Sequence, residues 1–81
     1  MELKEFTEYL VKSIATEPDM VKVQEFGGED DSVVLEVLVH ESDMGAIIGK
    51  QGKMAKSLRT LVQAYAYLHD NKRVKINIDS F

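Results

Sequence analysis

Two glycines three residues apart, Gly49 and Gly52, constrain this chain more than any other feature of its sequence. An apolar pair precedes them and a long run with helical spacing follows, which predicts a helix, a tight turn and a second helix. Glycine lets a phosphate approach the backbone closely, and the second helix would offer free N–H groups at its N-terminus. Lys50 and Lys53 place positive charge at the same bend. The turn is therefore suited to holding a sugar-phosphate backbone.

Hydrophobic periodicity predicts three helices and three strands. The helices are expected at residues 2–16, 43–48 and 53–69, and the strands at residues 20–26, 33–39 and 73–78. Pro18 ends the first helix, Ser42 is a candidate N-cap of the second, and residues 27–32 form a turn between the first two strands. The buried stripe of the long helix is expected to comprise Met54, Leu58, Leu61, Val62, Tyr65 and Leu68.

The order α-β-β-α-α-β predicts an α+β fold built as a two-layer sandwich. A short turn joins the first two strands, which pair antiparallel, whereas two helices join the second strand to the third, which lies parallel to it. The result is a three-stranded mixed sheet with all three helices on one face. The opposite face stays open and carries Lys22, Gln24, Lys75 and Asn77. All 81 residues are expected to form a single domain, residues 1–81.

Charge is divided unevenly along the chain. The net charge is −4, but residues 1–48 carry −9 and residues 49–81 carry +5. The basic half begins at the glycine turn, so that part of the surface could attract a polyanion while the rest repels it. Two solvated faces without a binding role are the alternative explanation.

The composition argues against several classes of function. The chain has no cysteine, which excludes disulfides and thiolate metal sites. No apolar run approaches the roughly 20 residues of a membrane span and the N-terminus is too polar for a signal peptide, so we expect a soluble, cytoplasmic protein without a membrane partner. The two histidines lack the spacing of metal ligands, and no serine has a recognisable partner base. We therefore expect no catalytic residue, no metal site, no cofactor and no enzymatic activity.

The run from Ile47 to Gly52 resembles the signature of a KH domain, in which an apolar pair precedes Gly-x-x-Gly between two helices. The element order is similar to that of the type II, or prokaryotic, KH arrangement, and the likeness extends over nearly all 81 residues. In its length, and from Asp43 to Lys56, the chain is similar to small bacterial proteins that consist of one KH domain. Spacing alone would favour Gly49 as a simple helix cap and Gly52 as a loop residue, but the lysines, the isoleucines and the element order favour the KH interpretation.

The resemblance implies that the loop clamps about four nucleotides of single-stranded RNA. The backbone clamp falls on Gly49, Lys50, Gln51 and Gly52. The apolar groove wall falls on Ile47 and Ile48, with Ala46 beside them. Successive phosphates of the RNA would be contacted by Lys53, Lys56 and Arg59 beyond the loop. Arg73 and Lys75 would contact phosphates from the opposite side. Because few aromatic residues lie near the loop, we expect weak, salt-sensitive binding with a loose sequence preference.

The long helix carries more apolar surface than one buried stripe needs. Ala55, Ala64, Ala66 and Tyr67 are expected to lie off the core side. A homodimer surface around Ala64 and Tyr67 is one explanation, and helix propensity with an exposed tyrosine is the other. The resemblance also implies pairing with itself or with a larger KH-containing protein.

Two functions remain open at this point. The first is an RNA chaperone or post-transcriptional regulator that acts through its glycine loop, which the basic second half favours. The second is a protein-interaction module with incidental RNA affinity, which the acidic first half favours.

Overall fold

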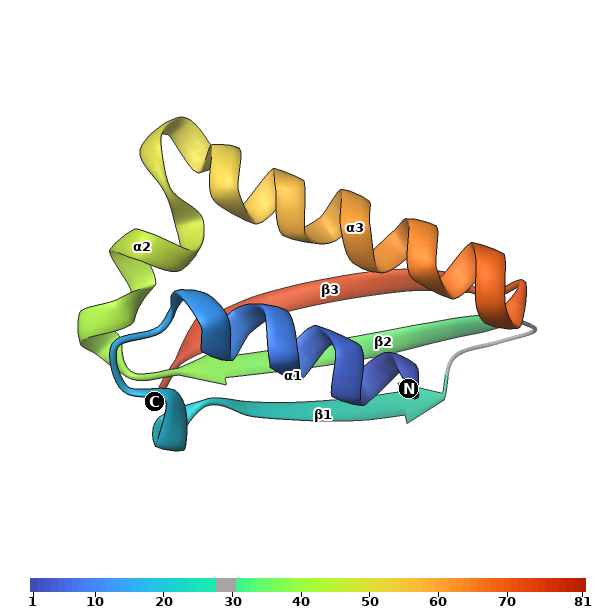
Figure 1. Ribbon diagram of the computed structural model, residues 1–81, viewed down its shortest axis with the longest axis horizontal. Coiled ribbons are helices and arrows are strands. Elements are labelled where there is room, and N and C mark those ends of the chain that lie inside the picture. Colours follow the sequence, from blue (N-terminus) through green and yellow to red (C-terminus); the bar gives the residue numbers. More distant parts are fainter. Residues whose placement is uncertain (28–30) are drawn as a thin grey trace.

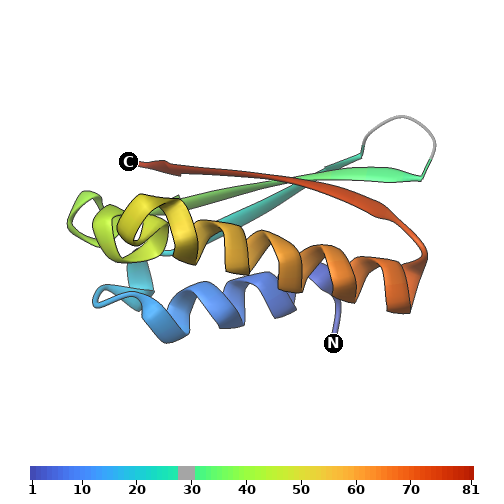
Figure 2. The same cartoon turned by 90° about the horizontal axis from the view of Figure 1, so that it is seen from above.

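The computed structural model describes residues 1–27 and 31–81, which form a three-stranded sheet with three helices on one face (Figures 1 and 2). The helices are α1 (Leu3–Ile14), α2 (Met44–Ile48) and α3 (Lys53–Asp70), and the strands are β1 (Lys22–Gly27), β2 (Ser32–Val39) and β3 (Arg73–Ser80). The predicted α+β sandwich and its element order are confirmed. The centre of the turn predicted over residues 27–32 lies outside the described residues.

The sheet has the predicted order β1-β2-β3. Strand β2 pairs antiparallel with β1 and parallel with β3, so it lies in the middle. Every second side chain of β2, from Val33 to Val39, is buried beneath the helices. The alternate side chains of β2 are half-buried on the other face, which no described helix covers (Figure 2).

Polar side chains occupy the open face as the alternation predicts. Gln24 and Asn77 lie on either side of Glu36, and the Asn77 amide donates a hydrogen bond of 3.0 Å to the Glu36 carboxylate. Lys22 and Lys75 are exposed on the same face. The helices therefore enclose one core and leave the other side of the sheet to solvent.

The buried side of α3 differs from the predicted stripe. The buried residues of the helix are Ala55, Leu58, Val62 and Ala66. Met54, Leu61 and Leu68 are exposed by 39%, 51% and 77%. The prediction is confirmed for Leu58 and Val62 but was wrong for the three exposed residues, because it placed the largest side chains inward. It was also wrong for Ala55 and Ala66, which were expected off the core side and instead face the core. Ala64 and Tyr67 are exposed, as predicted.

Several element boundaries also differ from the sequence-based ones. Helix α1 ends at Ile14 because Ala15 is already extended, and Pro18 begins a 3-10 turn that takes in Met20. Strand β1 consequently begins at Lys22. Ser42 does not cap α2, since it lies in a 3-10 turn and its hydroxyl contacts Nδ1 of His40 at 2.8 Å.

Candidate nucleic-acid interface

The loop between α2 and α3 is built from left-handed backbone (the yellow bend in Figure 1). The φ angles of Gly49, Gln51 and Gly52 are 77°, 55° and 73°. The residues from Lys50 to Gly52 form one 3-10 turn that leads into α3. Glycine adopts such angles freely, whereas glutamine does so at a cost. Three positive φ angles in four residues reverse the chain within a single turn.

Gly49 is fixed by its contact with the first turn of α3. A Cβ atom on Gly49 would lie 2.6 Å from the Met54 Cβ and 2.9 Å from the Met54 backbone nitrogen. No other residue type fits without moving the main chain. A Cβ atom on Gly52 would meet nothing within 4 Å, so only the φ angle of 73° favours glycine there. The two glycines of the motif thus serve different purposes.

The loop leaves the N-terminus of α3 open. Inside the loop, the Gly52 N–H donates to the Gly49 carbonyl at 3.3 Å and the Lys53 N–H donates to the Lys50 carbonyl. No described side chain caps α3, and its first turn holds no acidic residue. The first N–H groups of α3 therefore have no described side-chain partner, and the positive end of the helix dipole lies at the loop, which favours an anion such as a phosphate.

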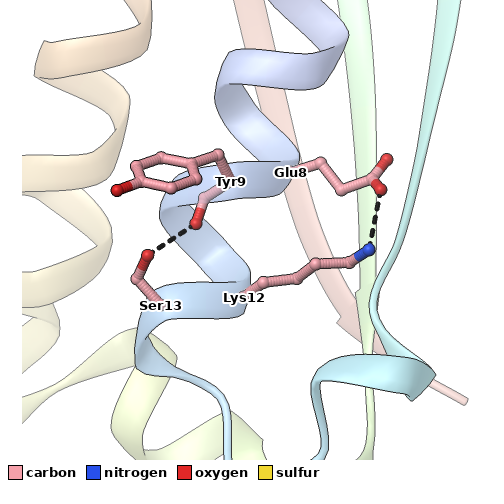
Figure 3. A network of polar contacts seen from close by, with 4 residues as sticks. All are labelled: Glu8, Tyr9, Lys12 and Ser13. Carbon is pink, nitrogen blue, oxygen red and sulfur yellow. Dashed lines mark hydrogen bonds and ion pairs between the residues drawn. The ribbon is translucent and has the colours of Figure 1, made fainter.

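Four cationic side chains lie in the loop and along the first two turns of α3. Lys50, Lys53, Lys56 and Arg59 are all exposed. None of them forms an ion pair with a residue that the structure describes. On the outer surface of α1, by contrast, Lys12 and Glu8 are paired at 2.9 Å, and the Ser13 hydroxyl donates to the Tyr9 carbonyl at 2.8 Å (Figure 3). The loop cations remain available to a polyanion.

The predicted apolar wall is only partly at the surface. Ile47 is completely buried and packs in the hydrophobic core, so it cannot offer the predicted contact surface and instead supports α2 from within. Ile48 is half-buried and Ala46 is exposed. The wall beside the loop therefore reduces to these two side chains.

The structure does not bring Arg73 and Lys75 to the loop. Both are exposed near the start of β3, which follows the far end of α3 (Figure 1). The 18 residues of α3 correspond to about 27 Å of helix. Lys75 also projects from the open face of the sheet, beside Val34. The length of α3 separates these two residues from the loop, so the structure does not place them opposite it.

One hollow of the described structure lies away from the loop. It is an open cleft of about 530 Å³ between the start of α1 and the end of α3. Its lining includes Glu2, Glu5, Glu25 and Asp70, which would repel a phosphate. Residues 1–27 and 31–81 contain no cluster of potential metal ligands. Within the same ranges, no helix is long and apolar enough to cross a membrane.

Sequence reasoning missed Asp43, a buried carboxylate immediately before α2. Its Oδ1 accepts hydrogen bonds from the Thr16 N–H at 2.9 Å and the Thr16 hydroxyl at 2.7 Å, and its Oδ2 accepts one from the Glu17 N–H at 2.9 Å. The Thr16 hydroxyl and backbone bonds outweigh desolvation and lower the pKa of Asp43 below its usual value of 3.8. The sequence gives no local signal for this contact, because its partners lie more than 25 residues away.

Comparison with solved structures shows the same fold in a larger protein. The chain is similar to part of Era in its crystal structure with MgGDPNP and a segment of 16S ribosomal RNA, with a TM-score of 0.70 and 19% identity. The similarity to Aquifex aeolicus Era gives a TM-score of 0.69 and again 19% identity. Each match covers 96% of this chain but 29% of the Era chain. The likeness establishes the fold.

Comparison of sequences is more specific. The RNA-binding protein KhpA of Clostridium perfringens is 45% identical over 76 residues, which cover 94% of this chain and 99% of that protein. The protein of the same name from Borreliella burgdorferi is 42% identical over 74 residues, which cover 91% of this chain and 88% of that protein. The family described as KhpA/KhpB, KH domain, matches residues 4–78. The chain therefore belongs to the KhpA/KhpB family of KH domains.

Proposed function

We propose that this protein is an RNA-binding module, not an enzyme, and that it clamps single-stranded RNA with the loop from Gly49 to Gly52. The observation that carries the proposal is the left-handed loop, which leads into α3 where no described side chain caps the helix and no described residue pairs with the nearby cations. Its relatives are named RNA-binding proteins, which agrees with this chemistry.

The mechanism is capture of the sugar-phosphate backbone. A phosphate lies against the two glycines, where free N–H groups of α3 point toward it. Lys50 and Lys53 neutralise its charge, and Lys56 and Arg59 follow the next phosphates along α3. Bases contact the small apolar surface of Ala46 and Ile48 beside the loop.

Binding of this kind is weak and tolerant of sequence. The large aromatic side chains that are exposed in the described residues are Tyr9, Phe26, Tyr67 and Phe81. None lies in α2 or in the loop, so stacking contributes little and phosphate contacts dominate. These properties suit an RNA chaperone or post-transcriptional regulator in the cytoplasm, which meets many transcripts.

The test is fluorescence anisotropy with a short unstructured RNA across a series of salt concentrations. The variant Lys50→Asp with Gln51→Asp keeps both glycines, and aspartate tolerates left-handed backbone better than most residues. We expect this variant to lose at least about tenfold in affinity, since each lost phosphate contact weakens binding and flattens the salt dependence.

A matched control separates the loop from net charge. Lys4→Asp with Ser13→Asp changes the charge by the same amount on the exposed surface of α1. Circular dichroism verifies that both variants fold. Equal affinities of parent and loop variant, or equal losses in the two variants, would show that the loop is not the RNA site.

The exposed side of α3 suggests a protein partner as well. Met54, Ser57, Leu61, Ala64 and Leu68 follow the alternating three- and four-residue spacing of a coiled-coil seam. Tyr67, exposed by 68%, lies beside this stripe, and an open hollow of about 460 Å³ lined by Lys56, Ser57, Thr60 and Leu61 lies on α3. The stripe supports a homodimer through α3, or a heterodimer with a larger KH protein of the KhpB type.

Sedimentation of two tyrosine variants tests this surface. Tyr67→Glu places a charge beside the stripe, and Tyr9→Glu makes the same change at a tyrosine of α1 that is exposed by 62%. We expect the parent and Tyr9→Glu to sediment as dimers and Tyr67→Glu as a monomer. A Tyr67→Glu variant with the mass of a dimeric parent would place the interface elsewhere, and a monomeric parent would leave only the heterodimer.

A further inference from the structure

Helix α2 is too short to be stable without contacts to the rest of the protein. It has five residues, well below the length at which an isolated helix is stable in water. Its position therefore depends on tertiary contacts. Ile47 is buried in the core, Gly49 packs against Met54, and the Asp43 carboxylate anchors the N-terminal end.

The contact at Asp43 joins two distant parts of the chain. Thr16 and Glu17 lie between the end of α1 and the turn at Pro18, and both direct backbone N–H groups to the carboxylate. Asp43 is 1% exposed, and its two oxygens accept three hydrogen bonds of 2.7–2.9 Å. Charge-assisted bonds of this length hold their partners in one geometry.

We propose that Asp43 is a positioning residue for the glycine loop. It touches no part of the loop itself, but it fixes the N-terminal end of α2, and the loop begins at Gly49 directly after the C-terminal end of this five-residue helix. The inference rests on the proposed RNA-binding function and extends it: the clamp is held in its binding geometry before RNA arrives. Loss of the anchor would let α2 tilt, so that RNA binding would have to restore the loop geometry.

Burial of a carboxylate is a costly way to attach a helix. An apolar side chain of similar size would supply comparable stability without the desolvation of a charge. A set of three directed hydrogen bonds adds orientation, which apolar packing alone does not give. This difference is the reason for assigning Asp43 a role in loop geometry beyond fold stability.

The test changes the partner of Asp43 rather than the carboxylate. Thr16→Val removes the 2.7 Å hydroxyl bond at an exposed position, and Thr16→Ser retains it. Thr7→Val is the matched control, because the Thr7 hydroxyl bonds to the Leu3 carbonyl within α1. RNA affinity is measured by anisotropy, and the amide signals of Gly49 and Gly52 in the free protein are followed by NMR.

We expect Thr16→Val to shift or broaden the signals of both glycines and to lower RNA affinity about fivefold to tenfold, which is about the net contribution of one hydrogen bond. Thr16→Ser restores both properties, and Thr7→Val leaves both unchanged even if it lowers stability. Asp43→Asn, where it folds, gives the larger effect because it also places an amide N–H₂ near a backbone donor.

Two results would overturn the inference. One is a folded Thr16→Val variant with the affinity and glycine signals of the parent, and the other is an equal response in Thr7→Val. A parent protein that does not bind RNA would instead refute the proposed function. The glycine signals would still show whether Asp43 sets the geometry of the loop.

Discussion

The two ends of α3 use similar backbone conformations for opposite purposes. At the C-terminal end, Asn71 is left-handed with a φ of 52°, and the N–H groups of Asn71 and Lys72 return to the carbonyls of Tyr67 and Ala66 at 3.1 and 3.2 Å. The last turn is thereby closed upon itself. At the N-terminal end, Gln51 and Gly52 are also left-handed, yet no described side chain caps the helix.

The two ends of α3 also differ in the charge of the side chains around them. Lysines without an ion pair in the described residues lie at the N-terminal end, whereas the cleft at the C-terminal end is lined by four carboxylates, Glu2, Glu5, Glu25 and Asp70, beside Lys72. A helix end that satisfies its own polar groups needs no ligand, while one that leaves N–H groups free among cations is prepared for an anion. The contrast between the ends is thus a stronger indication of function than either end alone.

Gly49→Ala should have the largest effect at the N-terminal end of α3. The added Cβ would lie 2.9 Å from the Met54 backbone nitrogen, and a φ of 77° with a ψ of 176° is open only to glycine. We expect a loss of roughly 3 kcal/mol in unfolding free energy and the loss of RNA binding, from strain and displacement of the loop. Urea denaturation and anisotropy measure the two effects.

Gly52→Ala is the control for that variant. Its Cβ would meet no atom within 4 Å, so only the left-handed φ of 73° is unfavourable, at about 1 kcal/mol. A Gly49→Ala variant as stable as Gly52→Ala would contradict the close contact between the loop and α3.

Acid should weaken the attachment of α2 through Asp43. The Thr16 hydrogen bonds lower the pKa of Asp43 below 3.8 in the folded protein. The carboxylate therefore contributes its full stability above the unfolded pKa of about 3.9 and loses it as pH falls through the lower folded pKa. Asp43→Asn cannot titrate, so the stability difference between parent and variant should be constant above about pH 5 and shrink below about pH 4. A difference independent of pH, measured by urea denaturation, would refute this account.

Charge removal at the two ends compares them directly. Lys53→Ala with Lys56→Ala and Lys72→Ala with Arg73→Ala remove two positive charges each from exposed positions. The N-terminal pair should lower RNA affinity about tenfold near 0.1 M salt and reduce the slope of log affinity against log salt by about 1.4, as for two lost phosphate contacts. The C-terminal pair should remain within about twofold of the parent. Equal losses would mean that binding follows overall charge rather than the loop.

The sequence predicted the sheet and the loop because both depend on local patterns. Alternation in β2 and β3 and the two-helix crossover determine the topology, and the glycine spacing marks the turn. The side of α3 that faces the core could not be predicted in the same way. Ala55 and Ala66 face the core because the helix lies close to it, which depends on its neighbours rather than on its own periodicity.

The candidate site shows the same limit. The cations from Lys50 to Arg59 follow one another in the chain, so sequence places them together. The position of Arg73 depends on where α3 ends, and the bonds of Asp43 depend on how α1 meets α2; neither has a local signature. Distances through space, rather than residue types, were the missing information.

The smallest expected effect comes from the two left-handed residues that are not glycine. Gln51→Gly should raise the unfolding free energy by about 0.5–1 kcal/mol, because relief of strain at a φ of 55° exceeds the added entropy of the unfolded chain. Asn71→Gly should give a smaller gain, since asparagine tolerates this conformation better than glutamine. Urea denaturation of both variants measures the difference. A larger gain in unfolding free energy at Asn71 than at Gln51 would show that the backbone of the loop is less strained than the backbone at the C-terminal end of α3. The contrast between the two ends would then depend on charge alone.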